Sequence, residues 1–419
     1  MPEIPGLRIL FLTTELPWPL DGGGKLRTYE TLACLARFAE VRVLSFSEDP
    51  APGASVSALE GALPGVSVLP PIPHAIRIRR QPLALARAGV NRLVHREPYL
   101  VAKFRNREYA RIAREEGRTF RPDVVWCDHL NVWPAAVRAR PDAALVLDEH
   151  NVESDLFRLA AGAGPLSLRL ASRVEGRAAL SFERAALAKA DRVVAISGED
   201  GRRLRELGGG DRVVVRLPSM GELPAPRPPP APSDSIGFLG TLSWPPNAEA
   251  VAFLAREVAP ALASRGASVR IGIGGKGLSP GIAAQVRDAG LSMYGWVDDA
   301  EAWFRGVGAS IVPLRSGSGI AMKLLDAMRA GVPVVSTSAG ARGLGVRDGE
   351  ELLLADGAAA LADAILRVCR DEPLRQRLVH NAHEYLVRAH GREAATADYE
   401  AIARGALGHR AAKEDRLGT

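Results

Sequence analysis

The segment "PSMGELPAPRPPPAPSD", residues 218–234, decides how the chain is organised. Proline lacks a backbone N–H and fixes φ, so this density of prolines excludes helix and central strand and leaves an extended, semi-rigid connector. On both sides of it, short apolar runs alternate with longer helical patterns, which indicates a parallel, doubly wound α/β sheet in each half. We therefore expect two Rossmann-like domains, residues 1–217 and 235–390. Residues 391–419 are expected to form a C-terminal helix returning to the first domain, with a polar tail.

Both halves contain the elements that such sheets require. In the first half, apolar runs predict strands at residues 7–12, 41–46, 123–126, 144–147, 192–196 and 212–217. Helical periodicity predicts helices at residues 28–37, 82–93, 106–116 and 166–189. In the second half, the runs "SIGFLG", "SVRIGIGG", "LSMYGW", "ASIVPL" and "VPVVST" predict strands. Helices are expected there at residues 247–263, 322–329, 374–389 and 392–406.

Composition narrows the class of protein. The chain has 419 residues, 47% of them hydrophobic, which is enough for two domains with separate cores. No segment approaches the roughly 20 apolar residues that span a bilayer, and the first ten residues lack the pattern of a signal peptide. Three scattered cysteines without metal-ligand spacing argue against disulfides and zinc. We expect a cytoplasmic protein, either free or peripheral at the inner face of a membrane.

The net charge is +6, and the excess is concentrated between Ile76 and Arg121. Such a segment can contact anionic lipid, nucleic acid or an acidic substrate. Solvated helix faces in an arginine-rich protein are the simpler interpretation. Nucleic acid is disfavoured, because no aromatic residues are interleaved with the charges. An anionic membrane surface is therefore the partner that this segment would fit.

Ligands of open α/β sheets bind beyond the carboxyl ends of the strands, and this rule selects the candidate residues. In the first half they are a glycine run at residues 22–24, Lys25, Arg27 and His150. In the second half they are Gly240, Thr241, Gly274, Arg315, Ser318 and Gly319, followed by a helix with Lys323 and Asp326. All of them would face one crevice if the two domains meet strand end to strand end.

The glycine run allows a close backbone approach to a ligand, and a helix N-terminus after it would favour an anion. It is not a Walker A loop, because Leu26 follows "GGGK" where serine or threonine is required. It is not a dinucleotide fingerprint either, since the glycines are contiguous. A glycine-rich turn without a ligand is the alternative.

The strongest single motif is "PLRSGSGIAMKLLDAMRAGVPVVSTSAGARGL", residues 313–344. A glycine-rich turn enters a helix on which Lys323 and Asp326 are three residues apart and so near one face. The turn can hold a phosphate, Lys323 can neutralise it, and Asp326 can accept hydrogen bonds from ribose hydroxyls. A solvated Lys–Asp pair is the alternative, which the flanking glycines disfavour.

This motif resembles the nucleotide-sugar motif of GT-B glycosyltransferases of the large retaining family four. In that family a glycine-rich turn precedes a Glu-x7-Glu pattern that ends in "LEAMAxGxPVV". Here "LLDAMRAGVPVV" matches, with Asp326 at the second acidic position. The resemblance extends over nearly the whole chain through "GGGKLR", "DEHNVES", "FLGTLSWPPNAEAV" and "GARGLGVRDGEELLLAD".

The resemblance implies the GT-B fold, with two parallel sheets facing across a cleft. It also implies transfer of a hexosyl group from a nucleoside-diphosphate sugar to an acceptor hydroxyl with retention of configuration, and without a metal or a further cofactor. The implied catalytic residues are His150, Arg315 and Lys323. The implied donor-binding residues are Gly23, Gly24, Gly240, Thr241, Gly274, Ser318, Gly319, Ile320 and Asp326. The implied acceptor-binding residues are Lys25 and Arg27.

The sequence departs from the family pattern at two positions. Ser318 stands at the first acidic position of Glu-x7-Glu, and "TLSWPPN" replaces the usual Arg and Lys after the first strand of the second domain. Arg315 and Lys323 are then the residues available to neutralise the diphosphate. Two other functions stay open: a nucleotide-sugar epimerase of the same fold, and a non-catalytic nucleotide-sugar-binding subunit. The acceptor can be a glycan, a lipid-linked acceptor or a small molecule, as in polysaccharide, glycolipid or natural-product glycoside synthesis.

Overall fold

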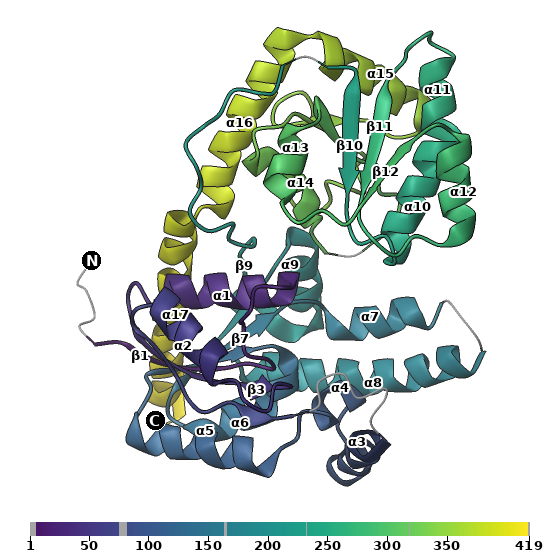
Figure 1. Cartoon of the computed structure of the whole chain (residues 1–419). Coiled ribbons are helices and arrows are strands. Elements are labelled where there is room, and N and C mark those ends of the chain that lie inside the picture. Colours follow the sequence, from purple (N-terminus) through teal and green to yellow (C-terminus); the bar gives the residue numbers. More distant parts are fainter. Residues whose placement is uncertain (1–5, 75–81, 163–165, 232, 318, 418–419) are drawn as a thin grey trace. The chain divides into compact units, whose positions relative to one another are not determined.

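The computed structural model describes residues 6–74, 82–162, 166–231, 233–317 and 319–417. It divides the chain into two compact units. In Figure 1 the first is coloured purple to teal, with its C-terminal helix in yellow, and the second is coloured teal to yellow-green. Unit 1 is Met1–Ser219 together with Arg392–Thr419, and unit 2 is Met220–Gly391.

Within its described residues, unit 1 is built on a seven-stranded parallel sheet in the order β4-β2-β1-β6-β7-β8-β9. The strands are β1 (Arg8–Leu12), β2 (Glu40–Leu44), β4 (Val66–Val68), β6 (Val124–Asp128), β7 (Ala144–Glu149), β8 (Arg192–Ala195) and β9 (Val213–Val215). Every residue of β6 and β7 is buried, as expected for parallel strands covered on both faces. Two further short strands, β3 (Phe46–Ser47) and β5 (Ile72–Pro73), pair with each other in a separate two-stranded sheet.

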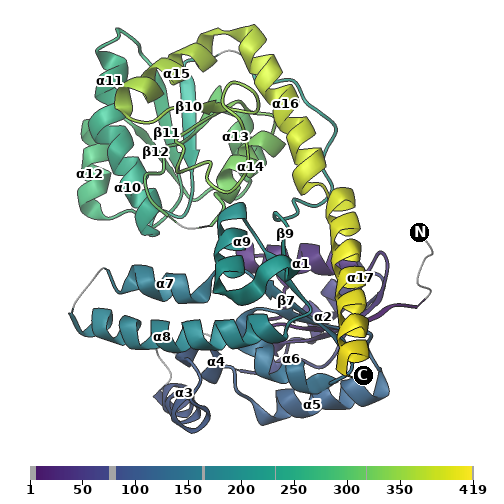
Figure 2. The same cartoon turned by 180° about the vertical axis from the view of Figure 1, so that it is seen from behind.

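Helices of unit 1 alternate with these strands. They are α1 (Gly23–Leu35), α2 (Gly53–Ala62), α3 (Pro82–His95), α4 (Tyr99–Ala102), α5 (Arg107–Thr119), α6 (Trp133–Ala139), α7 (Glu153–Ala160), α8 (Leu166–Lys189), α9 (Gly198–Leu204) and α17 (Arg392–Leu417). The last helix joins this unit through buried contacts: the Tyr399 hydroxyl is 3.1 Å from Thr31 Oγ1, and Arg392 donates to Glu30 of α1 at 2.8 Å. The views in Figures 1 and 2 show α7 and α8 running side by side.

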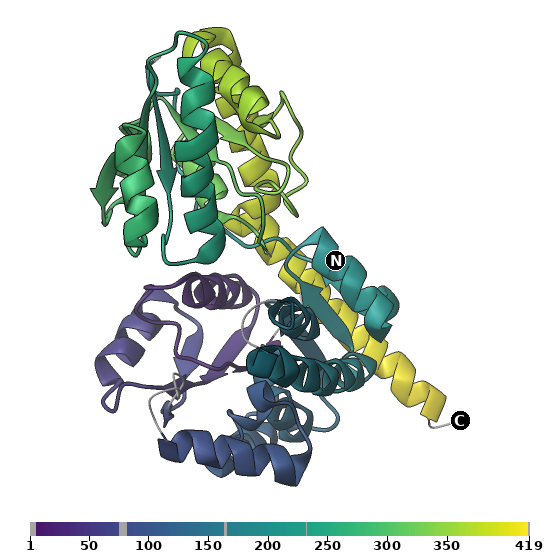
Figure 3. The same cartoon turned by 90° about the vertical axis from the view of Figure 1, so that its right-hand side faces the viewer.

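Unit 2 has, in the part that the structure describes, a six-stranded parallel sheet in the order β12-β11-β10-β13-β14-β15. The strands are β10 (Ser235–Leu239), β11 (Arg270–Gly274), β12 (Ser292–Gly295), β13 (Ala309–Val312), β14 (Val334–Ser336) and β15 (Leu353–Leu354). The helices are α10 (Pro245–Phe253), α11 (Ala259–Ala263), α12 (Pro280–Asp288), α13 (Ala300–Arg305), α14 (Met322–Arg329), α15 (Ala358–Arg370) and α16 (Glu372–His390). Helices α10 to α12 lie on one side of the strands and α13 and α14 on the other (Figure 1). In Figure 3 the side with α10 to α12 faces the viewer.

The structure confirms the expected α/β class with two parallel sheets, and it corrects several boundaries. The helix expected at residues 247–263 contains a π-helical turn, Leu254–Val258, between α10 and α11. Helix α1 begins at Gly23, so the glycine run enters the helix. The expected polar tail continues α17 to Leu417, because its Ala, Arg and Glu residues favour helix and Arg410 pairs with Glu414 one turn away at 2.9 Å.

The strand order places one switch point in each sheet. In unit 1, β1 lies between β2 and β6, and in unit 2, β10 lies between β11 and β13. At each switch point, the chain connections that follow the two adjoining strands run to opposite sides of the sheet. A crevice therefore opens at the carboxyl ends of these strands. Among the described helices, none is long and apolar enough to cross a membrane.

Candidate functional site

At the switch point of unit 2, the loops after β10 and β13 enclose a cavity of about 330 Å³. It is lined by Gly240, Thr241, Trp244, Pro246, Asn247, Leu314, Ser316, Gly317, Gly319, Ile320, Ala321, Met322, Lys323 and Ala339. Five of the donor-site and catalytic residues expected from the sequence are therefore brought together: Gly240, Thr241, Gly319, Ile320 and Lys323. Ser318 lies outside the described residues.

The backbone around this cavity depends on glycine. A Cβ at Gly240 would lie 3.0 Å from Asn247 Nδ2 and 3.1 Å from Lys323 Nζ, so a side chain there would displace one of them. Gly319 has a φ of +78°, which an L side chain rarely adopts. The helix that follows, α14, has neither a side-chain cap nor an acidic residue in its first turn. The N–H of Leu324 donates to the Ala321 carbonyl at 2.9 Å, and the partial positive charge of the helix N-terminus is left for an anion.

Lys323 brings a cation to the cavity. Its ammonium group donates to Asn247 Oδ1 and lies 4.7 Å from the centre of the Phe238 ring. Burial lowers the pKa of Lys323 to about 8, although the nearby Asp326 carboxylate acts in the opposite direction. The side chain is therefore positively charged at neutral pH, but it is poorly solvated and has no ion-pair partner among the described residues. A phosphate in the cavity would supply one.

Asp326 lies one turn further along α14. Burial raises its pKa to about 6, against the effect of Arg329 and Lys323, and the carboxylate accepts no hydrogen bond from a described residue. Asp326, which was expected at the donor site, is not among the residues that line the cavity.

Two further residues expected at the donor site lie elsewhere. The Arg315 side chain is half exposed, pairs with Glu257 at 3.5 Å and lies over the Phe253 ring, so it does not line the cavity. Gly274 is buried at the end of β11, where a Cβ would lie 2.8 Å from Leu239 Cδ1. In this structure Gly274 serves packing. The predicted role of Arg315 requires its guanidinium group to leave Glu257.

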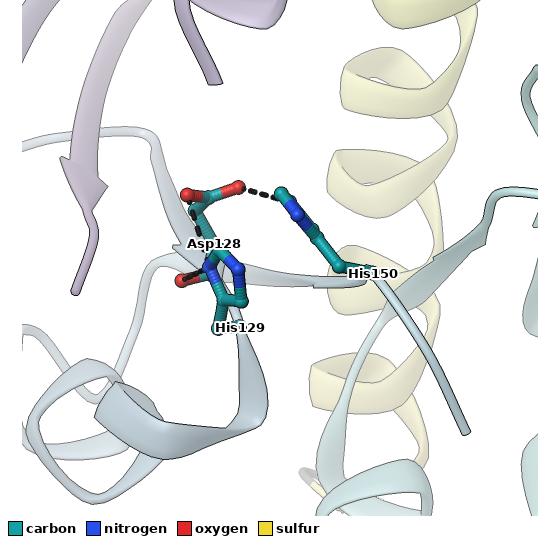
Figure 4. Close-up of side chains that lie close together, drawn as sticks. All are labelled: Asp128, His129 and His150. Atoms are coloured by element: carbon teal, nitrogen blue, oxygen red, sulfur yellow. Dashed lines mark hydrogen bonds and ion pairs between the residues drawn. The ribbon is translucent and has the colours of Figure 1, made fainter. Parts of the chain in front are cut away.

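Unit 1 has a buried polar cluster at its own switch point (Figure 4). Asp128, the last residue of β6, is completely buried and contacts both His129 and His150, whose ring centres are 3.7 Å apart. Its Oδ1 accepts from His150 Nε2 at 2.7 Å, and its Oδ2 accepts from the hydroxyls of Thr13 and Thr28 at 2.7 and 2.9 Å. His150, the residue after β7, is therefore held by a carboxylate rather than by its own loop.

The charges within this cluster follow from burial and proximity. Burial, assisted by the neighbouring His129, lowers the pKa of His150 to about 4, so this ring is neutral at pH 7. Burial opposes ionisation of Asp128, but the two histidines hold its pKa well below the usual range. Burial likewise opposes protonation of His129, yet the adjacent Asp128 carboxylate raises its pKa. His150 thus donates Nε2–H to Asp128 and presents Nδ1 as an acceptor.

The cluster also has the composition of a metal site, because ligand atoms of Asp128, His129 and His150 lie within 4.8 Å of one another. One carboxylate and two imidazoles suit a divalent transition metal. However, both carboxylate oxygens already accept hydrogen bonds from His150 and two hydroxyls. The arrangement is therefore complete as a hydrogen-bonded network that orients His150.

The glycine run begins α1 beside this cluster. Gly22 is the extended N-cap residue, and Gly23 and Gly24 are exposed and carry no side-chain cap. The basic residues after them are already paired: Lys25 with Asp21 at 2.9 Å and Glu15 at 3.3 Å, and Arg27 with Asp148 at 2.6 Å. Arg27 is buried, so its role in this structure is internal rather than acceptor-binding.

Sequence reasoning missed Asp128, His129 and Asn247. Asp128 and His129 follow the apolar run that predicts a strand at residues 123–126, so the strand-end rule would have found them had the strand been extended by two residues. Asn247 was placed in a helix without a role, and only the fold reveals its contacts with Thr241 and Lys323.

Comparisons with known protein families give a glycosyltransferase match for each half of the chain. The family described as "Glycosyl transferase 4-like domain" matches residues 22–219, and "Glycosyl transferases group 1" matches residues 233–371. An uncharacterized 44.6 kDa protein in the cps region of Klebsiella pneumoniae is 26% identical over 162 residues, 36% of this chain and 41% of that protein. The lipopolysaccharide core biosynthesis glycosyltransferase LpsE of Rhizobium meliloti is 34% identical over 121 residues, 28% of this chain and 34% of that protein.

A phosphatidyl-myo-inositol mannosyltransferase of Mycobacterium leprae is 38% identical over 93 residues, 21% of this chain and 25% of that protein. The chain thus spans between a quarter and about two fifths of the length of these curated relatives. Two solved structures share the fold over nearly the whole chain. Anabaena Alr3699/HepE in complex with UDP and glucose has a TM-score of 0.60 at 16% identity, covering 94% of this chain and 98% of that one. TarM has a TM-score of 0.66 at 10% identity, covering 96% and 100%.

Proposed function

The chain belongs to the group 1 glycosyltransferases of the GT-B fold, and from this premise we propose that it transfers a hexosyl group from a nucleoside-diphosphate sugar to an acceptor hydroxyl. The observation that carries the proposal is the cavity of unit 2, where a partly buried lysine without an ion-pair partner meets an uncapped helix N-terminus. This combination is complementary to a diphosphate. The fold match to a protein solved with UDP and glucose is in keeping with such a donor.

Departure of the nucleoside diphosphate is the step that the cavity would assist. As the glycosidic bond to the donor breaks, negative charge accumulates on the leaving phosphate and positive charge on the anomeric carbon. Lys323 would neutralise the phosphate, with backbone N–H groups near Gly319 and Ile320, and Asp326 would accept from the ribose hydroxyls. Arg315 would join them only after leaving Glu257.

In unit 1, the same proposal gives His150 the role of orienting a hydroxyl of the donor sugar or of the acceptor. Its neutral ring is held by Asp128 and presents Nδ1 as an acceptor. We propose that the new bond forms with retention of configuration and that no metal takes part, with charge neutralisation supplied by Lys323. Gly23 and Gly24 would let the chain approach the ligand closely, since both are exposed and uncapped.

The acceptor in this proposal is a glycan or a lipid-linked glycan at the inner face of a membrane. One of the matching relatives is described as a lipopolysaccharide core biosynthesis glycosyltransferase, and another as a phosphatidyl-myo-inositol mannosyltransferase. A small-molecule acceptor would be compatible with the same donor chemistry.

A donor panel tests the proposal. The purified protein is incubated with UDP-, GDP-, dTDP- and ADP-hexoses, with and without EDTA, and released nucleoside diphosphate is measured beside Lys323→Ala. Lys189→Ala, an exposed lysine on α8, is the matched control. We expect slow release from one donor, unchanged by EDTA and by the control substitution, and lowered at least about 100-fold by Lys323→Ala.

Other outcomes would replace the proposal. Interconversion of the donor sugar without nucleotide release would indicate an epimerase, and donor binding without turnover in the presence of glycan and lipid-linked acceptors would indicate a binding subunit. If EDTA abolishes release, the metal-independent part is wrong. The anomeric configuration of the product, read by NMR, decides between retention and inversion.

A further inference from the structure

Apart from Leu20, the exposed large apolar side chains of unit 1 lie on the helices α3, α7 and α8. On α8, Leu166 is 68% exposed and Val174 is 57% exposed, and Leu159 at the end of α7 is 60% exposed. On α3, Leu93 is 77% exposed. This helix adjoins α8 through Glu175, which accepts hydrogen bonds from Arg92 and from the backbone N–H of Tyr99. Glu175 lies on the opposite side of α8 from Leu166, so Leu93 belongs to another face. Scattered exposed leucines need no explanation, but a cluster of them does.

The arrangement on α8 is amphipathic in an unusual way. Leu166, Leu170 and Val174 are spaced by four residues and form one strip along the helix. Arg173 and Arg177 lie on the same side, since they are three or seven residues from members of the strip. Apolar and basic side chains are therefore neighbours on one exposed face, whereas a helix that packs on a core separates them.

Beside this strip, α7 and α8 enclose a cavity of about 530 Å³ with a basic lining. Its charged residues are four arginines, Arg158, Arg173, Arg177 and Arg203, and a single acid, Asp155. The helices can approach each other at its floor because residue 176 is glycine: a Cβ there would lie 3.2 Å from Phe157 Cβ. Figure 2 shows the two helices that form its walls.

The arginines of the cavity are not all neutralised by the protein. Asp155 pairs with Arg203 at 3.1 Å and with Arg158 at 3.4 Å. Arg173 and Arg177 form no ion pair or hydrogen bond with any residue that the structure describes, and both are exposed. By contrast, Arg92, Arg105 and Arg111 of the basic segment expected from the sequence are each paired with a glutamate.

We propose that the α7–α8 surface, defined as this cavity with Leu159, Leu166, Leu170 and Val174, binds the phosphate headgroups of an anionic lipid membrane. The arginines would receive the phosphate, and the apolar strip would enter the acyl boundary of the bilayer. Charge complementarity selects this occupant over a second copy of the chain, because two such surfaces would oppose their free arginines. The inference goes beyond the proposed transfer reaction, and it is tested without donor or acceptor.

Vesicle flotation of the full chain tests it. Vesicles of phosphatidylcholine alone are compared with vesicles in which about a third of the lipid is phosphatidylglycerol, at low and high salt. We expect binding to the anionic vesicles only, weakened by salt. The double substitution Arg173→Gln/Arg177→Gln should lower the partition coefficient about thirty-fold, since each basic residue at an anionic surface contributes about five-fold.

The matched control is Arg114→Gln/Arg118→Gln. These arginines have the same spacing on an exposed helix of unit 1 and line another arginine-rich cavity, which is not edged by the apolar strip. We expect their loss to lower the partition coefficient much less. Leu166→Gln/Leu170→Gln should weaken vesicle binding at least about ten-fold while leaving its salt dependence in place.

Three results would overturn the proposal. Equal losses in the two arginine variants would mean that overall charge, not this surface, drives binding. Displacement from vesicles by millimolar inorganic phosphate or glycerol phosphate would mean that the cavity takes a soluble anion. Concentration-dependent dimerisation that Leu166→Gln/Leu170→Gln abolishes, without vesicle binding by the parent chain, would assign the surface to a second copy.

Discussion

Replacing Lys323 with methionine should stabilise the fold at neutral pH while removing donor turnover. Methionine keeps the length and apolar stem of the side chain but not the ammonium group, which is largely withdrawn from water beside Phe238. In the proposed function, Lys323 stabilises the donor complex at the expense of the free protein, and the substitution separates these two effects.

The size of the effect follows from the pKa of Lys323, which burial lowers from 10.5 to about 8. A ten-fold change in a protonation equilibrium is worth about 1.4 kcal/mol, so burying the charged form costs about 3 kcal/mol below pH 8. The variant also loses the hydrogen bond to Asn247, worth about 1 kcal/mol. A net gain of about 2 kcal/mol in the free energy of unfolding remains at pH 7.

The sign of the pH dependence is fixed by the lowered pKa. In the unfolded chain Lys323 stays charged up to about pH 10.5, whereas in the folded protein it loses its proton above about pH 8. The wild-type protein therefore recovers stability as the pH rises through this window, and the advantage of the variant should fall to near zero at about pH 9.5. Thermal unfolding at both pH values measures this, with Lys189→Met as the exposed control.

The reasoning is refuted if Lys323→Met is less stable than the wild type at pH 7, or if its advantage does not shrink as the pH rises. Donor turnover is measured on the same preparations, and we expect a loss of at least about 100-fold. A stabilised variant that still turns over donor normally would show that the lysine is buried for another reason.

Three further predictions concern single side chains. Gly240→Ala would bring a methyl group to 3.1 Å from Lys323 Nζ, so we expect donor KM to rise about ten-fold with little change in Tm, whereas an unchanged KM would contradict this geometry. Asp128→Asn should lower turnover about 100-fold, because the amide cannot hold the His150 ring as the carboxylate does; full activity would exclude that role. Glu149 is buried, and burial raises its pKa well above 4.5. The wild-type protein should therefore lose stability as the pH rises through the pKa of Glu149 in the folded state. Glu149→Gln should remove this pH dependence, measured by urea unfolding at pH 5 to about 9.

The rule that ligands bind beyond the carboxyl ends of strands predicted those site residues that directly follow a single strand. His150 follows β7, and Gly240 and Thr241 follow β10, so recognising an apolar run and its end was sufficient to find them. The glycine-rich turn and the helix after it added Lys323 and Asp326, and the family resemblance added Ile320. None of this required knowing which strands are neighbours.

What the sequence could not predict are contacts that depend on strand order. Arg27 was expected at the surface as an acceptor ligand, yet it is buried against Asp148, 121 residues away, because β1, β6 and β7 are consecutive in the sheet. The position of Asp128 follows from the end of its own strand, but its burial does not, since two of its partners, Thr13 and Thr28, lie just after β1 and in α1. An aspartate at the end of an apolar run is typical of a loop, and only these distant donors make its burial possible.

The pairing of charges differs between the two switch points. This difference supports the proposal that the diphosphate of the donor binds in unit 2 and that unit 1 contacts a hydroxyl. At the switch point of unit 1 the basic groups are already neutralised within the protein: Lys25 by Asp21 and Arg27 by Asp148. A diphosphate there would have to displace an existing carboxylate. In unit 2, Lys323 donates a hydrogen bond to Asn247 but has no ion-pair partner among the described residues. The helix that carries it, α14, has no side-chain cap at its N-terminus. The unsatisfied positive charge therefore lies in unit 2, whereas unit 1 offers a neutral imidazole acceptor suited to a hydroxyl.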